Sequence, residues 1–197
     1  MRAPPASLAD IPVAAVTLDP STLLRVSSHG TGEPHFGRNG CNRFDDGRLP
    51  AAGRFGTCYL GKSLTVALAE TLLHDEVAVA GRFAVAPEEV RRRHVVTFRG
   101  TALTLADCTG VALKRMGLDG RLSTELDTRA TQAWAAALHE HPAAVDGLLY
   151  VSRHLNTGKA VVLFYRAGAK LQLVDVAPLQ EYPGATAALA ALGVDFV

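Results

Sequence analysis

Residues 55–76 read FGTCYLGKSLTVALAETLLHDE, and this stretch decides how the fold is interpreted. Phe55–Gly61 has the composition of a short strand. Ser63 is a plausible helix N-cap before an apolar run, so we expect a helix through about Asp75. Glu70 falls about two turns into this helix among Leu, Val and Ala. It is either a partly exposed glutamate or a functional one, because a buried carboxylate is costly unless it is paired or hydrogen-bonded.

Length and composition indicate one soluble globular domain with a substantial core: 197 residues, 48% of them hydrophobic and 20% charged. The net charge of +1 lacks the basic balance of many nucleic-acid-binding proteins, so we predict no direct binding to nucleic acid. Three cysteines without CxxC spacing predict neither a disulfide framework nor a zinc site and favour the reducing cytoplasm. No apolar run approaches the roughly 18 residues of a membrane span, so no membrane association is expected.

Proline and glycine divide the N-terminal part of the chain. Residues 1–20 carry four prolines, which predicts an N-terminal arm over 1–21 and a domain over 22–197. Residues 29–54 are rich in Gly, Pro, Asn and Asp and predict a loop. Loops of this length in compact domains are usually functional or disordered.

The remaining segments alternate between strand and helix patterns. The order predicts an α+β fold, a single domain with a mostly antiparallel β core and flanking helices. The basic run Arg91–His94 is interpreted as a solvent-exposed helix end or loop. The expected strands are 22–28, 147–153, 159–166 and 170–176, with a hairpin at 94–107; the expected helices are 86–93, 108–117, 127–141 and 184–193.

Four further residues are candidates for a site, each with a structural alternative. Arg43, in the sequence CNRFDDG, either tethers its loop to a neighbouring aspartate or offers a fork of donors to a phosphate or carboxylate. Arg25 interrupts a predicted strand, as an outward-facing charge or as part of a site. Tyr59 is either a core tyrosine or a stacking surface for a flat ring. Ser152 ends an apolar strand, where loops and ligands meet.

Several common catalytic motifs are missing from the sequence. There is no GxSxG, no P-loop and no GxGxxG opening a helix after a strand. The seven histidines contain no HExxH, so we predict no metal site.

The order and spacing of the candidate residues carry more information than any one of them. Arg25 is followed by NRF at 42–44, CYLG at 58–61, ALAETLLH at 67–74, TQAWA at 131–135, DGLLYVSR at 146–153 and AVVLFYR at 160–166. This arrangement resembles the RES domain, which is named for an Arg, a Glu and a Ser.

The resemblance covers about residues 23–166. It maps the three named residues to Arg43 (or Arg25), Glu70 and Ser152. Phe44 stands where many members carry Trp, and Arg38 is a second loop arginine able to exchange roles with Arg43.

The resemblance implies a fold similar to diphtheria-toxin-like ADP-ribosyltransferases. RES-domain proteins are typically toxins of bacterial toxin–antitoxin pairs whose partners are Xre-type helix-turn-helix antitoxins. Known members consume NAD as a substrate: some degrade it by phosphorolysis or hydrolysis, and at least one type ADP-ribosylates a protein. No metal is expected.

The resemblance also implies roles for individual residues. Glu70 would stabilise the oxocarbenium-like transition state when the nicotinamide–ribose bond breaks. Tyr59 would stack on the nicotinamide ring, and Arg43 and Arg25 would bind the pyrophosphate or an incoming inorganic phosphate. Ser152 would bond to the nicotinamide–ribose portion or position another of these side chains.

Three functional hypotheses follow: cleavage of NAD with phosphate or water as acceptor, mono-ADP-ribosylation of a host protein, and a non-catalytic binding module. The segment SLTVALA at 63–69 contains no acid to activate a protein acceptor, which favours a small acceptor. The retained Arg43, Tyr59, Glu70 and Ser152 argue against a non-catalytic module.

Overall fold

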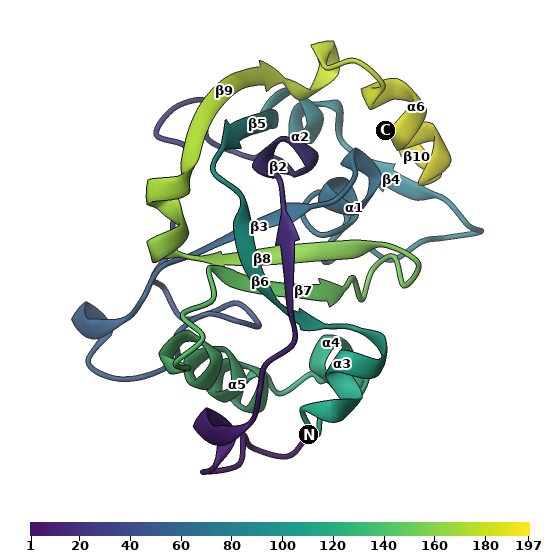
Figure 1. Cartoon of the computed structure of the whole chain (residues 1–197). Helices are drawn as coiled ribbons and strands as arrows, with labels where there is room; N and C mark the ends of the chain where they lie inside the picture. Colours follow the sequence, from purple (N-terminus) through teal and green to yellow (C-terminus); the bar gives the residue numbers. More distant parts are fainter.

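Eight strands form one sheet in the order β1-β6-β7-β8-β3-β2-β5-β9 in the computed structural model, which describes residues 1–197 (Figure 1). Two further strands, β4 (Phe83–Val85) and β10 (Val194–Phe196), pair in parallel apart from it. The strands of the main sheet are β1 (Ala15–Leu18), β2 (Leu24–Ser27), β3 (Thr57–Gly61), β5 (His94–Gly100), β6 (Leu103–Cys108), β7 (Gly147–Val151), β8 (Lys159–Phe164) and β9 (Leu171–Pro178).

Six of the seven pairings in the main sheet are antiparallel, and only β6 and β7 run parallel. The predicted α+β fold with a mostly antiparallel core is therefore confirmed. The α-helices are α1 (Leu64–Ala69), α2 (Pro87–Arg91), α3 (Gly110–Arg115), α4 (Arg121–Thr124), α5 (Thr128–Glu140) and α6 (Ala185–Ala191). Short 3-10 helices cover Leu8–Asp10, Pro20–Thr22, Ala51–Gly53, Tyr165–Lys170 and Leu179–Glu181.

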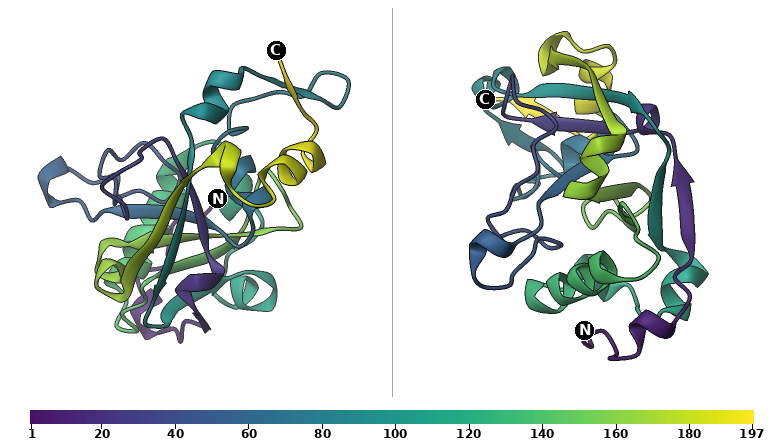
Figure 2. Two further views of the ribbon diagram at one scale, coloured as in Figure 1. Left: turned by 90° about the horizontal axis from the view of Figure 1, so that it is seen from above. Right: turned by 60° about the vertical axis from the view of Figure 1, so that its left-hand side comes forward.

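The buried apolar residues form three clusters that follow from strand alternation. On β8, Val161 and Leu163 face one cluster, and Val162 and Phe164 face another. The cluster that contains Val161 and Leu163 also contains side chains from strands near both ends of the strand order. The sheet therefore curls over this face. The opposite face is covered by two separate groups of helices: α3, α4 and α5 at the end nearer the N-terminus, and α1, α2 and α6 at the end nearer the C-terminus (Figure 2).

The hairpin predicted at 94–107 is wrong. Both strands exist, but β5 pairs with β2 and β9, whereas β6 pairs with β1 and β7. Gly100 has a φ of +144°, where a Cβ would meet the carbonyl of Lys170. The chain bends at Gly100, and β5 and β6 therefore lie on opposite sides of the four central strands β7, β8, β3 and β2.

The helix predicted from Ser63 through Asp75 is shorter than expected. Ser63 is the N-cap, and its side chain accepts from the backbone N–H of Val66 at 3.2 Å. The helix ends at Ala69, so Glu70 is its C-cap residue rather than a mid-helix residue, and turns follow to Asp75.

The segment before residue 22 is integrated into the fold. β1 pairs with β6 along four residues, and the Trp134 indole N–H donates to the carbonyl of Arg2 at 2.9 Å. No helix combines the length and apolar character needed to cross a bilayer.

Candidate active site

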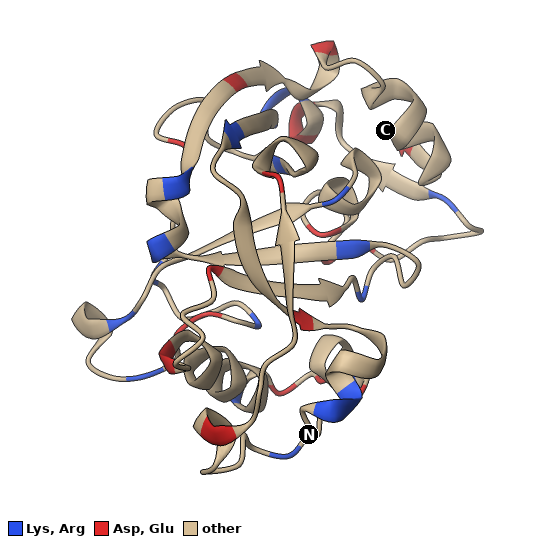
Figure 3. Ribbon diagram, viewed as in Figure 1, with Lys and Arg blue, Asp and Glu red and all other residues tan.

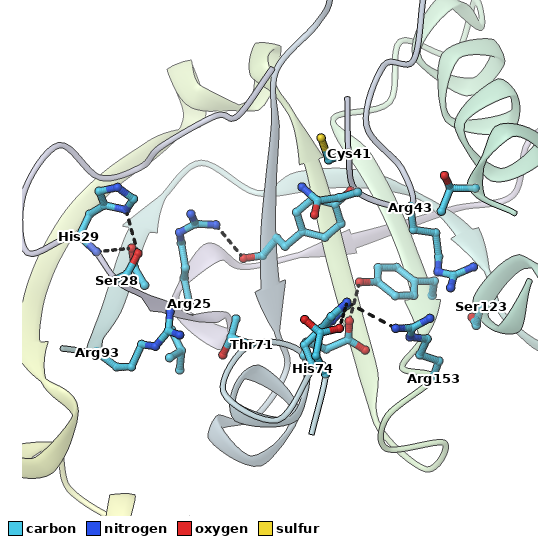
Figure 4. A pocket seen from close by; sticks show the side chains of 18 of the residues that line it. Arg25, Ser28, His29, Cys41, Arg43, Thr71, His74, Arg93, Ser123 and Arg153 are labelled. Carbon is cyan, nitrogen blue, oxygen red and sulfur yellow. Dashed lines mark hydrogen bonds and ion pairs between the residues drawn. The ribbon is translucent and has the colours of Figure 1, made fainter. Parts of the chain in front are cut away.

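A pocket of about 520 Å³ lies where the two groups of helices part. This volume is typical of a site for a small molecule. It is lined from β2 and the turn after it, the 41–43 loop, β3, the turns after α1, the α2–β5 junction, the segment from α4 to the start of α5, and the end of β7 (Figure 4). The lining residues are Arg25, Val26, Ser27, Ser28, His29, Cys41, Asn42, Arg43, Tyr59, Glu70, Thr71, His74, Asp75, Arg93, Ser123, Leu126, Thr128, Tyr150 and Arg153.

Glu70 enters this pocket from the end of α1 and is held by two hydroxyl groups of β7 and the turn after it. Its Oε1 accepts from Ser152 Oγ at 2.5 Å, and its Oε2 accepts from Tyr150 OH at 3.5 Å. Ser152 is fully buried and Tyr150 is 3% exposed. The cost of placing a carboxylate on an apolar helix is therefore offset by hydrogen bonds from side chains about 80 residues away in sequence.

Tyr59 presents its ring to the pocket while its hydroxyl is engaged elsewhere. The hydroxyl donates to Asp45 Oδ1 and accepts from the Phe44 N–H, both at 3.0 Å. Burial, together with the Asp45 carboxylate, raises the pKa of Tyr59 well above its usual value. The phenol therefore remains protonated and fastens the 39–46 loop to β3, which fixes the position of Arg43.

Arg25 lines the pocket and forms a buried ion pair. Its Nε lies 3.0 Å from Glu33 Oε2, and its Nη1 donates to the Tyr59 carbonyl at 3.2 Å. Burial opposes the charge of Arg25, but Cys58 and Glu33 outweigh it and the pKa of Arg25 is raised. Arg25 is thus a fixed cation whose charge is already balanced by Glu33.

Arg43 and Arg153 have no carboxylate within hydrogen-bonding distance. Arg43 donates to the Glu125 carbonyl at 2.6 Å, and Arg153 donates from Nε to His154 Nε2 at 2.8 Å and approaches His74 Nε2 at 3.4 Å. Burial, and then the charge of Arg153, lower the pKa of Arg43. Two neighbouring cations, neither of them paired directly with a carboxylate, make this side of the pocket suitable for an anion.

The arginines are divided between two sides of the pocket. Arg43 and Arg153 lie on one side, near Ser123. Arg25 and Arg93 lie on the other side, near Ser28 and His29 (Figure 4). Elsewhere basic and acidic residues are interspersed over the fold (Figure 3). The concentration of arginines is therefore a property of the pocket and does not extend over a whole face of the molecule.

The structure brings together four of the five predicted site residues: Arg25, Arg43, Tyr59 and Glu70 all line the pocket. Ser152 lies behind Glu70 and does not line it. Arg38, the alternative to Arg43, is not a lining residue, and its guanidinium stacks over the Tyr165 ring at 5.2 Å.

Sequence reasoning missed several lining residues. Tyr150 lies on β7 two residues before Ser152, and strand alternation therefore directs both side chains to the same side, a usable signal. Arg153 directly follows Ser152, and His74 is four residues after Glu70, but neither spacing identifies a site. Arg93, expected in a solvent-exposed helix end, also lines the pocket.

Residues 22–184 match the model of the RES domain family. The chain belongs to the RES domain family. The match extends beyond the predicted core of 23–166, as far as the turn before α6. No curated protein sequence matches the chain.

A similar solved structure supports the fold. It is a chain from the crystal structure of the M. tuberculosis MbcT–MbcA toxin–antitoxin complex, with a TM-score of 0.59 and 17% sequence identity. The alignment covers 89% of this RES domain chain and 93% of that chain.

Proposed function

We propose that this RES domain protein is the toxin of a bacterial toxin–antitoxin pair and cleaves NAD at the nicotinamide–ribose bond. The observation that carries the proposal is Glu70, held by buried hydroxyls in a pocket with two arginines that have no carboxylate within hydrogen-bonding distance. NAD supplies the matching chemistry, because its pyrophosphate is anionic and its glycosidic bond breaks through a cationic transition state.

Glu70 stabilises the positive charge that develops on the ribose. As the bond from C1″ of the nicotinamide ribose to the nicotinamide nitrogen breaks, its electron pair leaves with neutral nicotinamide, and an acceptor oxygen forms the new bond to C1″. Water as acceptor loses a proton and gives ADP-ribose, whereas inorganic phosphate gives ADP-ribose 1″-phosphate. The Glu70 carboxylate is half-buried, and its attraction to the transition-state charge is stronger there than in water.

The other lining residues orient the substrate. The Tyr59 ring offers a flat surface for nicotinamide because its hydroxyl is already bonded on the far side. Arg25 and Arg43 bind the pyrophosphate or the incoming phosphate. NAD acts as a substrate here, and no metal takes part in these steps.

The proposal includes a partner and a location. An Xre-type helix-turn-helix antitoxin neutralises the enzyme by covering the pocket, in the cytoplasm where NAD is available. The similar chain in a toxin–antitoxin complex supports this part of the proposal.

The test is nicotinamide release from NAD by the purified protein, with and without inorganic phosphate. Glu70→Gln is expected to abolish release, and Glu76→Gln, at an exposed residue outside the pocket, is the matched control. Release that needs phosphate identifies phosphorolysis, and release without it identifies hydrolysis. If no nicotinamide is released but labelled NAD modifies a protein in a cell lysate, the proposal is replaced by mono-ADP-ribosylation. No release and no labelling would refute an enzymatic function.

A further inference from the structure

Strand β7 and the residue after it present two hydroxyl groups to the two oxygens of one carboxylate. Tyr150 and Ser152 are two residues apart and therefore on the same face. Ser152 Oγ lies 2.5 Å from Glu70 Oε1, and Tyr150 OH lies 3.5 Å from Oε2. Both side chains are buried, which limits competition from water for these contacts.

The hydrogen bonds of Ser152 fix the direction of its proton. Its Oγ accepts from the backbone N–H groups of His154 at 3.2 Å and Leu155 at 3.1 Å. A hydroxyl has two acceptor positions and one proton, so the remaining proton points to Glu70 Oε1. Oε1 is therefore always an acceptor, and the two N–H dipoles strengthen the donated bond.

Tyr150 is the second donor. Its ring packs against Phe44 with 4.8 Å between centroids, which fixes the place of its hydroxyl. Burial, and then the Glu70 carboxylate, raise the pKa of Tyr150 well above its usual value, so the phenol keeps its proton. Its long contact makes it a weaker donor than Ser152.

The backbone that carries Glu70 is fixed against the same β7–β8 turn. Gly158 lies so close to α1 that a Cβ on it would stand 2.4 Å from Val66 Cγ2. Its carbonyl accepts from the Ser152 N–H at 3.0 Å. The turn therefore positions both the helix that bears Glu70 and the serine that holds its carboxylate.

We infer that Tyr150 and Ser152 are positioning residues that hold Glu70 with both oxygens as acceptors and aim it into the pocket, and that Ser152 does not contact the substrate. The inference rests on the proposed role of Glu70 in NAD cleavage. Of the two roles open to Ser152, contact with the nicotinamide–ribose portion and positioning of another side chain, the second is selected. Tyr150 is added to the Arg, Glu and Ser for which the family is named.

The kinetic test compares Ser152→Ala and Tyr150→Phe with wild type. We expect kcat to fall by about tenfold or more for Ser152→Ala and by a smaller factor for Tyr150→Phe, with KM for NAD changed by less than about twofold. Tyr182→Phe and Thr109→Ala, which remove hydroxyls outside the pocket, are controls expected to leave kcat unchanged. A raised KM with unchanged kcat for Ser152→Ala would refute the inference.

A binding test separates positioning from substrate contact without turnover. NAD affinity is measured for Glu70→Gln and for the double variant with Ser152→Ala. If Ser152 acts only through Glu70, the two dissociation constants agree within about twofold. A much weaker double variant would overturn the inference.

A structural test keeps the inference falsifiable if the protein does not cleave NAD. Crystal structures of Ser152→Ala and Tyr150→Phe are expected to show the Glu70 carboxylate rotated or in several conformers. A Glu70 side chain unmoved in both would contradict the inference, whereas absent NAD cleavage by wild type would contradict only the proposed function.

Discussion

Replacing Glu33 by Gln is expected to destabilise the protein by about 3 kcal/mol. The Glu33 side chain is fully buried, and the Arg25 side chain that it pairs with is 14% exposed. Glutamine keeps the size and an acceptor oxygen but leaves the Arg25 guanidinium without a counter-charge. Removing one partner of a buried pair costs about 3–5 kcal/mol, and the partial exposure of Arg25 places this pair at the lower end.

The assay is thermal and urea unfolding followed by circular dichroism. At roughly 2–4 °C per kcal/mol for a chain of this size, the melting temperature falls by about 6–12 °C. The matched control is Glu88→Gln, which breaks an exposed pair with Arg91 and costs about 0.5 kcal/mol or less. If Glu33→Gln cost no more than Glu88→Gln, the buried pair would not stabilise the fold.

The pH dependence of the difference in unfolding free energy between wild type and Glu33→Gln gives a second check. Burial raises the pKa of Glu33, but Arg25 and the hydrogen bonds from Ser27 and His35 outweigh it, and the net pKa lies below the ordinary value of 4.5. A depressed folded-state pKa gives stability that is complete above the unfolded value and is lost as pH falls through the folded value. The difference in unfolding free energy between wild type and Glu33→Gln is therefore constant at neutral pH and decreases below about pH 4.5.

Two other changes test how the pocket is built. Asp45→Asn leaves one acceptor oxygen where Asp45 has two, so either the Asn42 donors or the Thr57 and Tyr59 hydroxyls lose their acceptor; we expect a loss of about 2 kcal/mol in urea unfolding and a several-fold rise in KM for NAD, and an unchanged KM would refute the role of this loop. Gly158→Ala forces a Cβ against Val66 and is expected to cost about 1–3 kcal/mol and to lower kcat, whereas Gly53→Ala, in open space, changes neither; equal behaviour of the two variants would refute close packing at Gly158.

The sequence predicted the parts of the fold that depend on neighbouring residues. Ser63 and Asp127 were expected to begin helices, and each side chain accepts from a backbone N–H in the first turn of its helix. The three strands after residue 146 are also present. These features depend on capping and alternation within a few residues, which a single sequence contains.

The pairing of β5 and β6 was not predictable in this way. Both segments have strand patterns, but their partners β9 and β1 lie far away in the chain. A local pattern says that a segment is extended and not which strand lies beside it. The early end of α1 was not predictable either, because apolar residues continue beyond Ala69 although the chain forms turns there.

The candidate site was predictable where several motifs occur in a known order. Arg25, Arg43, Tyr59 and Glu70 line the pocket, and their roles stay predictions until the kinetics are measured. Arg93 was missed because a basic run at a helix end is usually solvated. Arg93 precedes β5, whose first residue, His94, pairs with Ser27 of β2, and this long-range pairing brings Arg93 to the pocket.

The pairing of β3 has a consequence for when the pocket forms during translation. β3 pairs with β2 at one residue position, Leu24 with Gly61, but with β8 along five positions. Tyr59 and Glu70 leave the ribosome first, while β8, which pairs with the strand of Tyr59, and β7, which carries a hydroxyl bonded to Glu70, are made some 80 or more residues later. A nascent chain that stops before β8 therefore lacks an ordered pocket, and the site forms only after β8 has been made.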